Sequence, residues 1–162
     1  MTKKKCTLAV SMMVILLLLC SCKKNNENTK ESFSRKDWAI MLSEAYDVDF
    51  YFKDEPYYED VTEDDEIFEI IQAMYEAGIL SQGTSKFKPK DKATLGFVIS
   101  SAVLASGIDY TSYDVNPKKA LIKCAKSYKI YEGDASSEEL TKPVSKEKAN
   151  DILQKILKIN DF

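Results

Sequence analysis

The sequence predicts an all-α protein of about five helices packed as a small bundle. Apolar residues recur at helical spacing in five segments, and a residue suited to capping a helix precedes each segment. Three of these segments share one pattern of apolar positions. No stretch alternates clearly enough for a central strand, although residues 47–58 leave room for a short one. A length of 162 residues suits one domain of ordinary size.

Three predicted helices share one design, in which apolar residues lie 4, 7, 8, 11 and 12 positions after a capping Ser34, Thr94 or Ser145. The first set is Trp38, Met41, Leu42, Ala45 and Tyr46, and the last is Ala149, Ile152, Leu153, Ile156 and Leu157. The middle set is weaker, with Val98, Ser101, Ala102, Ala105 and Ser106. Each set predicts a helix that buries a single stripe.

Two further helices are expected between them. Thr62 is expected to cap the first, with Asp65 completing a capping box, so that residues 63–66 place four acids in its first turn. Gly78 supplies the stop at its carboxyl end. Asn116 caps the second, and Pro117 occupies its first position.

The order of these helices indicates an internal repeat. The caps at Ser34, Thr94 and Ser145 lie 60 and 51 residues apart, which is typical of a repeated module. We divide residues 33–162 into a half-unit (33–57), a complete unit (58–107) and a second complete unit (113–158). A helix pair cannot bury its stripe alone, so the units are expected to pack on one another.

The first 32 residues are expected to form a leader and an anchor. Three lysines precede an apolar run of 13 residues, which is too short to span a bilayer but suits a secretory signal over residues 1–21. Leu19-Cys20-Ser21-Cys22 resembles the cleavage motif of bacterial lipoproteins and implies that Cys22 is acylated; Cys20 fits that motif less well. Residues 23–32 are polar and are predicted to be a flexible tether. The protein would then be held on the outer face of a cell membrane by lipid, in a bacterial envelope expected to be Gram-positive.

Composition excludes several classes of function. The chain has no His, which removes the usual general base and zinc ligand. Without Lys3, Lys4 and Lys5 it has 20 basic and 26 acidic residues, a net charge of −6, which argues against nucleic acid as a partner. Cys124 lies on an apolar stripe and is expected to be a buried, inert thiol. The sequence therefore predicts a protein that is not an enzyme, with no catalytic residue, metal or cofactor.

The ordered elements of the repeat resemble the S-layer homology (SLH) domain, over about residues 33–158. Its units begin with an aromatic-x-Asp-Val element, pass through Gly-Ile and Phe-x-Pro elements, and end with a Thr-Arg-Ala-Glu-like helix start. The first complete unit matches at residues 58–61, 78–80, 87–89 and 93–94, and the second matches at residues 113–115, 129–133 and 144–146. The half-unit matches at residues 33–37. SLH modules form helical bundles and bind anionic secondary cell-wall polysaccharide.

The resemblance implies which residues would contact such a polymer. The Arg position of the family falls on Arg35, on Leu95 and on Lys146, so the middle unit lacks the charge. A ketal carboxylate suits an Arg fork at a helix start, where backbone N–H groups also favour an anion. Arg35 and Lys146 are therefore the candidate anion contacts, with the alternative that both are ordinary exposed residues. Trp38 is favoured as a core residue over a platform for sugar stacking.

An acidic-aromatic segment at residues 44–69 carries 12 acidic residues and one basic residue. It is interpreted first as a solvated loop whose aromatic side chains cover the helix ends. A calcium site is the alternative, suggested by Asp47, Asp49, Asp54 and Glu55, although the EF-hand pattern is absent. A third alternative is a surface for a basic protein.

Two functions follow as hypotheses. The first is a membrane-anchored extracellular module that bridges to wall polysaccharide. The second is a protein-interaction subunit of an envelope complex that uses the acidic-aromatic segment. A hydrolase remains a third, weaker alternative.

Overall fold

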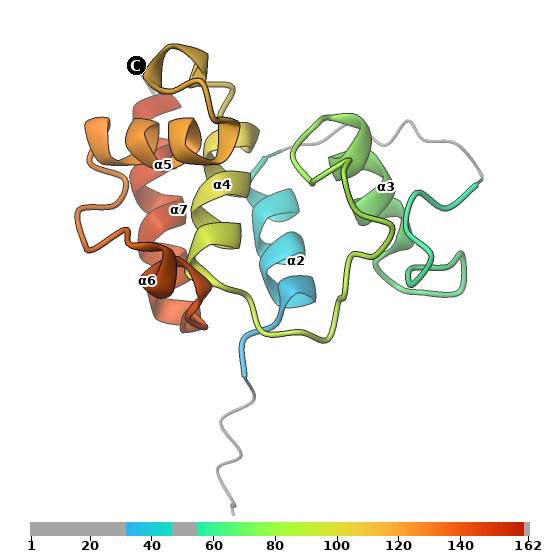
Figure 1. The fold of residues 1–162 in the computed structure, drawn as a ribbon. Helices are drawn as coiled ribbons and strands as arrows, with labels where there is room; N and C mark the ends of the chain where they lie inside the picture. Colours follow the sequence, from blue (N-terminus) through green and yellow to red (C-terminus); the bar gives the residue numbers. More distant parts are fainter. Residues whose placement is uncertain (1–31, 47–54, 161–162) are drawn as a thin grey trace, which may run out of the picture. The chain divides into compact units, whose positions relative to one another are not determined.

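This computed structural model describes residues 32–46 and 55–160, which contain six α-helices and one 3₁₀ turn joined by loops (Figure 1). The elements are α2 (Arg35–Ala45), α3 (Phe68–Glu76), α4 (Leu95–Ala105), η1 (Thr111–Tyr113), α5 (Pro117–Ser127), α6 (Ser137–Thr141) and α7 (Lys146–Asn160). The all-α prediction is confirmed, with the short α6 as an unexpected addition. Residues 32–162 cluster as one unit. The predicted leader, Cys22, the tether up to residue 31 and most of the expected calcium ligands lie outside the described residues.

Capping side chains fix where five of the described helices begin, four of them at predicted caps and α6 at Ser136. Ser34 and Asp37 form a complete capping box at α2: Ser34 Oγ accepts from the Asp37 N–H at 3.1 Å, and the Asp37 carboxylate accepts from the Ser34 N–H at 2.7 Å. Thr94, Asn116 and Ser145 each accept a hydrogen bond from the backbone N–H three residues on, at 3.4, 3.1 and 3.2 Å. These caps lie at the predicted positions.

The predicted start of α3 is wrong. Asp65 does accept from the Thr62 N–H at 2.7 Å, but the pair closes a turn, and the helix begins only at Phe68 without a side-chain cap. Both Val61 and Ile67 are buried, and the turn between them lets each side chain reach the core. The four acids of residues 63–66 therefore lie on this exposed turn, outside the first turn of the helix.

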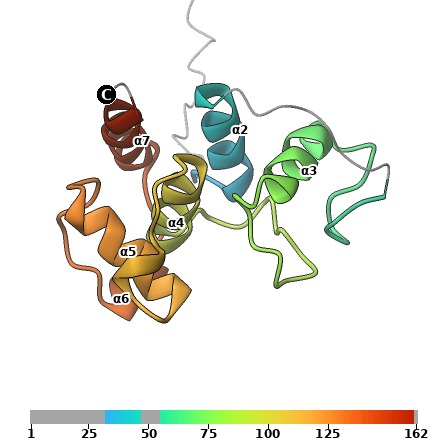
Figure 2. The same cartoon turned by 90° about the horizontal axis from the view of Figure 1, so that it is seen from above.

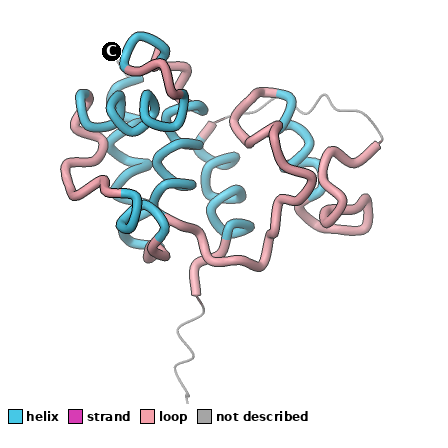
Figure 3. The backbone as a smooth tube through the Cα atoms, in the orientation of Figure 1, coloured by secondary structure: helices cyan, strands magenta, loops and turns pink. Residues whose placement is uncertain are grey.

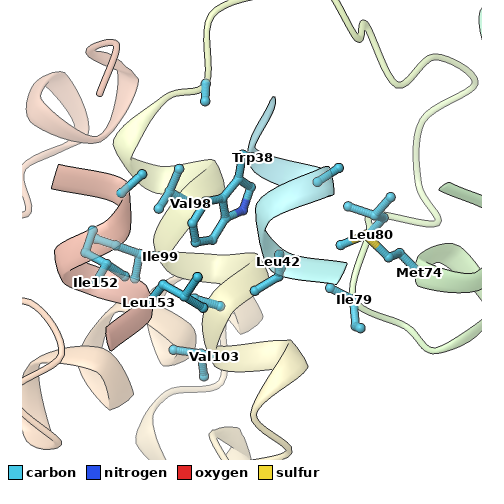
Figure 4. Packing of buried hydrophobic residues seen from close by; sticks show 14 of the residues in the cluster. Trp38, Leu42, Met74, Ile79, Leu80, Val98, Ile99, Val103, Ile152 and Leu153 are labelled. Carbon is cyan, nitrogen blue, oxygen red and sulfur yellow. The ribbon is translucent and has the colours of Figure 1, made fainter. Parts of the chain in front are cut away.

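The three helices of common design form the centre of the fold. Each of α2, α4 and α7 contacts the other two, while α3 packs on α2 and α5 packs on α4 (Figures 1 and 2). Trp38 lies between α2 and α4, close to the aliphatic residues of α7 (Figure 4). One continuous apolar core therefore joins every helical layer.

Backbone hydrogen bonds tie the start of each central helix to the loop before the next. The N–H of Arg35 donates to the Asp91 carbonyl at 2.8 Å, and the equivalent N–H of Leu95 donates to the Lys142 carbonyl at 3.0 Å. Two isolated antiparallel bridges accompany them, Ser34 with Lys92 and Thr94 with Pro143, and the described residues contain no strand (Figure 3). The starts of α2, α4 and α7 are thereby linked in series at one end of the bundle.

The outward side of α7 is polar, unlike those of α2 and α4. The fifth position after the cap is buried Ala39 in α2 and buried Ile99 in α4, the two helices that receive α3 and α5. In α7 that position is Asn150, which is exposed, and Gln154 one turn later is exposed too. The side of α7 that corresponds to the seats of α3 on α2 and of α5 on α4 is therefore polar.

Two equivalent helix ends adopt the left-handed conformation with different residues. Gly78 ends α3 at φ +72°, and Lys129 ends α5 at φ +56° with the same hydrogen-bond pattern. An L-residue with a Cβ is disfavoured there by roughly 1–2 kcal/mol, whereas glycine is not.

We therefore expect Lys129→Gly to raise the free energy of unfolding by about 1 kcal/mol, and Gly78→Ala to lower it by a similar amount. Urea titrations followed by far-UV circular dichroism measure both changes. Gly83→Ala, in an exposed loop where the added Cβ would make only an ordinary contact with Ser81 Oγ at 3.8 Å, is the matched control for the glycine change. A destabilising effect of Lys129→Gly would contradict this account.

Candidate functional site at the helix starts

Arg35 connects the start of α2 to the loop before α4. Its Nε–H donates to the Phe87 carbonyl oxygen at 2.7 Å, and its guanidinium carbon lies 3.9 Å from the centroid of the Phe97 ring. Burial lowers the pKa of this guanidinium, while Tyr58, Asp91 and Asp60 oppose the shift. An arginine remains charged in such a setting. Stacking on Phe97 therefore fixes the position of the fork.

Neither role predicted for Arg35, an anion contact or an ordinary exposed residue, accounts for everything that its side chain does. The side chain is half-buried rather than freely exposed, and part of it serves the fold. Within residues 32–46 and 55–160, its terminal Nη groups have no hydrogen-bond or ion-pair partner. Arg35 can thus hold the loop and still present its two terminal NH2 groups to an anion.

The loop beside Arg35 is rich in lysine. Lys86, Lys88, Lys90 and Lys92 are all exposed. The Asp60 carboxylate holds this loop in place by accepting the N–H groups of Phe87 at 2.7 Å and Lys88 at 2.8 Å.

Lys88 adopts φ +60°, a conformation uncommon for a residue with a Cβ. A shallow cavity of about 460 Å³ lies here, lined by Asp60, Lys88, Pro89, Lys90 and Asp91. The sequence analysis did not single out these lysines, although they alternate with other residues in and around the Phe-x-Pro element.

The start of α4 is closed by apolar packing. Leu95 is buried, and a Cβ placed on Gly96 would lie only 3.0 Å from the Leu140 carbonyl oxygen. Because Gly96 has no side chain, the short α6 can approach α4 closely at this position. This start offers no cationic side chain to a ligand, as its sequence predicts.

The start of α7 is open and basic. Lys146 is exposed and has no recorded partner among the described residues. Lys148 lies nearby with its Nζ 5.3 Å from the Tyr131 ring centroid. A small cavity of about 150 Å³ between Leu95, Tyr131 and Lys148 adjoins this start. Lys146 is thus available to an anion, without the geometry of an arginine fork.

Trp38 has no exposed surface. Its indole N–H donates to Ser101 Oγ at 2.7 Å inside the core. The ring therefore has no face to offer a sugar, and the core interpretation holds in this structure.

The aromatic residues of the acidic-aromatic segment that are described point largely inward. Tyr58 is buried and donates to the Ser81 carbonyl at 2.7 Å, and burial chiefly raises its pKa to about 12. Tyr57 stacks on Tyr75 with ring centroids 4.1 Å apart. Of the suggested calcium ligands only Glu55 is described, and the described residues contain no group of three possible metal ligands.

Cys124 is buried, and desolvation raises the pKa of its thiol, with Asp109 as a smaller cause. The thiolate needed for nucleophilic chemistry is therefore disfavoured.

No protein-family model matches the chain, and no curated protein matches it. None of the described helices is long and apolar enough to cross a membrane.

Proposed function

We propose that this protein is an extracellular, lipid-anchored binding module that holds an anionic cell-wall polysaccharide against the membrane. The anchor is Cys22, and the polymer contacts are Arg35 and Lys146 at helix starts, supplemented by the lysines of residues 86–92. In this proposal the module is SLH-like, carries no enzymatic activity and needs no cofactor.

The observation that carries the proposal is the set of cationic groups gathered where the central helices begin. Arg35 is fixed by Phe87 and Phe97, and Lys146 is exposed two helix starts further along the linked series, at α7. A helix start presents a favourable dipole to an anion. At α2 the first three backbone N–H groups already donate to Asp91, Pro89 and Ser34, so the side chain of Arg35 is the donor left for a ligand there. A chain that is acidic overall thus concentrates positive charge at one end, which suits a carboxylated or phosphorylated polymer.

Co-sedimentation of residues 23–162 with purified wall sacculi tests the proposal. We expect retention on native sacculi and release after chemical removal of the attached polymer. Lys146→Glu and Arg35→Lys should each weaken retention about fivefold, which corresponds to roughly 1 kcal/mol. Lys158→Glu makes the same charge change near the far end of α7 and should leave retention unchanged. Equal retention on stripped sacculi would rule out polymer binding.

A protein-interaction subunit remains the second candidate function. It is favoured by the turn of residues 62–67, whose carboxylates are exposed.

A further inference from the structure

Two helices at equivalent places in the repeat carry opposite charge. Residues 59–78, which include α3, contain eight acidic and no basic residues, whereas residues 117–129, which include α5, contain five lysines and no acidic residue. Both helices are the first of their unit, and each packs on the central helix that precedes it. The repeat has therefore produced one acidic and one basic version of the same element.

The basic version is a ridge facing solvent. Its apolar residues Ala120, Leu121, Cys124 and Ala125 are buried, which leaves the lysines outside. The exposed lysines are Lys118, Lys119, Lys123, Lys126 and Lys129. Within the described residues only Lys123 among them forms an ion pair, to Asp114 at 2.7 Å.

Two apolar side chains flank this ridge. Val115 just precedes α5 and is fully exposed, and Tyr128 directly follows it at 44% exposure. They are the exposed large hydrophobic residues of the described chain. Exposed apolar residues at the ends of an unpaired charged ridge are features of an interaction surface.

The acidic version has a complementary character. Exposed carboxylates cover its turn and helix, at Glu59, Glu63, Asp64, Asp65, Glu66, Glu69 and Glu76. Glu66 pairs with Lys36, but Glu63, Asp64 and Glu69 have no recorded partner among the described residues. Half-buried Ile70 and Tyr75 lie on the same helix and offer apolar contact.

The two surfaces lie on opposite sides of the central helices. α3 lies beyond α2 and α5 lies beyond α4, on different sides in both views (Figures 1 and 2). The lysine ridge of one molecule therefore cannot reach its own acidic surface. A second molecule can bring its acidic surface to the ridge.

We propose that the α5 ridge of one copy docks on the acidic surface of residues 59–76 of another copy, head to tail. The contact joins different surfaces of the two molecules, so it leaves one free surface of each kind and can extend into a row. Its ion pairs are exposed, so the association is weak and sensitive to salt. Confinement on a shared surface would raise the effective concentration of the copies. The proposal does not depend on polymer binding.

Zero-length carbodiimide crosslinking of residues 23–162 tests the contact directly, because it joins a lysine to a carboxylate that touches it. The buried core lies within residues 32–162, which form one compact unit, so a protein of residues 23–162 is suitable for this experiment. A mixture of ordinary and ¹⁵N-labelled protein distinguishes crosslinks between molecules from crosslinks within one. We expect intermolecular crosslinks from the α5 lysines to residues 59–76, which disappear in 0.5 M salt.

Charge reversals provide the decisive comparison. The triple variant Lys118→Glu, Lys119→Glu, Lys126→Glu should lower the association constant between copies at least tenfold, as measured by analytical ultracentrifugation. So should the triple variant Glu63→Lys, Asp64→Lys, Glu69→Lys. The combined sixfold variant has the net charge of the original protein, exchanges the two surfaces and should self-associate again.

The matched control reverses three exposed lysines elsewhere, Lys86→Glu, Lys90→Glu and Lys158→Glu, and should leave association unchanged. Thermal unfolding of each variant checks that it is folded. Failure of the sixfold variant to associate while folded would overturn the proposal. So would binding of the ridge to vesicles with phosphatidylglycerol but no crosslink between copies, since the ridge would then be a lipid surface.

Discussion

Trp38→Ala is expected to lower the free energy of unfolding by about 3–5 kcal/mol, the range seen when a large aromatic residue is removed from a core. Trp38 is fully buried between α2 and α4, where it joins two of the three central helices. Its N–H donates to Ser101 Oγ, which in turn donates to the Phe97 carbonyl at 2.7 Å. The substitution leaves a cavity and removes one link of this buried chain.

Urea titration followed by far-UV circular dichroism measures the change, since Trp38 is the only Trp and its fluorescence is lost with it. Trp38→Phe keeps an aromatic ring and should cost less. Ala substitution of exposed Lys158, near the end of α7, should change stability by less than about 0.5 kcal/mol. A loss below 1 kcal/mol for Trp38→Ala would show that this residue does not join the helices.

Helix starts were the part of the fold most readable from sequence, because capping is local. Ser34, Thr94, Asn116 and Ser145 each bond a backbone N–H three residues away, so their effect depends on neighbouring residues alone. The same reasoning failed at Thr62. There, burial of both Val61 and Ile67 required a turn between them, and the core decided the local structure.

Contacts between distant residues were beyond sequence reasoning. Arg35 was a candidate because the SLH resemblance places the family's Arg there, at a helix start. Its bond to Phe87 crosses 52 residues of chain, and its stacking on Phe97 depends on how α2 meets α4. The left-handed conformation of Lys129 was also missed, because lysine gives no signal of it. Only the equivalent hydrogen bonds of Gly78 reveal its role.

The charge difference between α3 and α5 shows a different limit. Both compositions are visible in the sequence, but neither says which way the charged residues face. The fold places the two helices on opposite sides and buries the apolar stripe of each. The acidic residues 59–76 and the lysines of α5 are therefore two exposed surfaces of opposite charge.

Asp60→Ala is expected to lower the free energy of unfolding by about 3 kcal/mol and to weaken polymer retention. Its two carboxylate oxygens accept the N–H groups of Phe87 and Lys88, and hydrogen bonds to a charged group contribute roughly 1.5–3 kcal/mol each. Without them, two backbone N–H groups lose their partners and Lys88 loses the restraint that keeps its left-handed conformation. The carbonyl that holds Arg35 belongs to Phe87, so the guanidinium would be released too.

Glu59→Ala is the matched control, since Glu59 is the exposed neighbour of Asp60 and loses the same charge. Asp114→Ala tests the equivalent aspartate of the next unit, which accepts from the Asn116 N–H and Lys123 and should affect α5 alone. Urea titration gives the stability of each variant, and sacculus co-sedimentation gives its retention. If Asp60→Ala is as stable as Glu59→Ala, this carboxylate does not hold the loop. If it is unstable yet fully retained, residues 86–92 and Arg35 are not the polymer contacts, and the charge at the α7 start must account for binding.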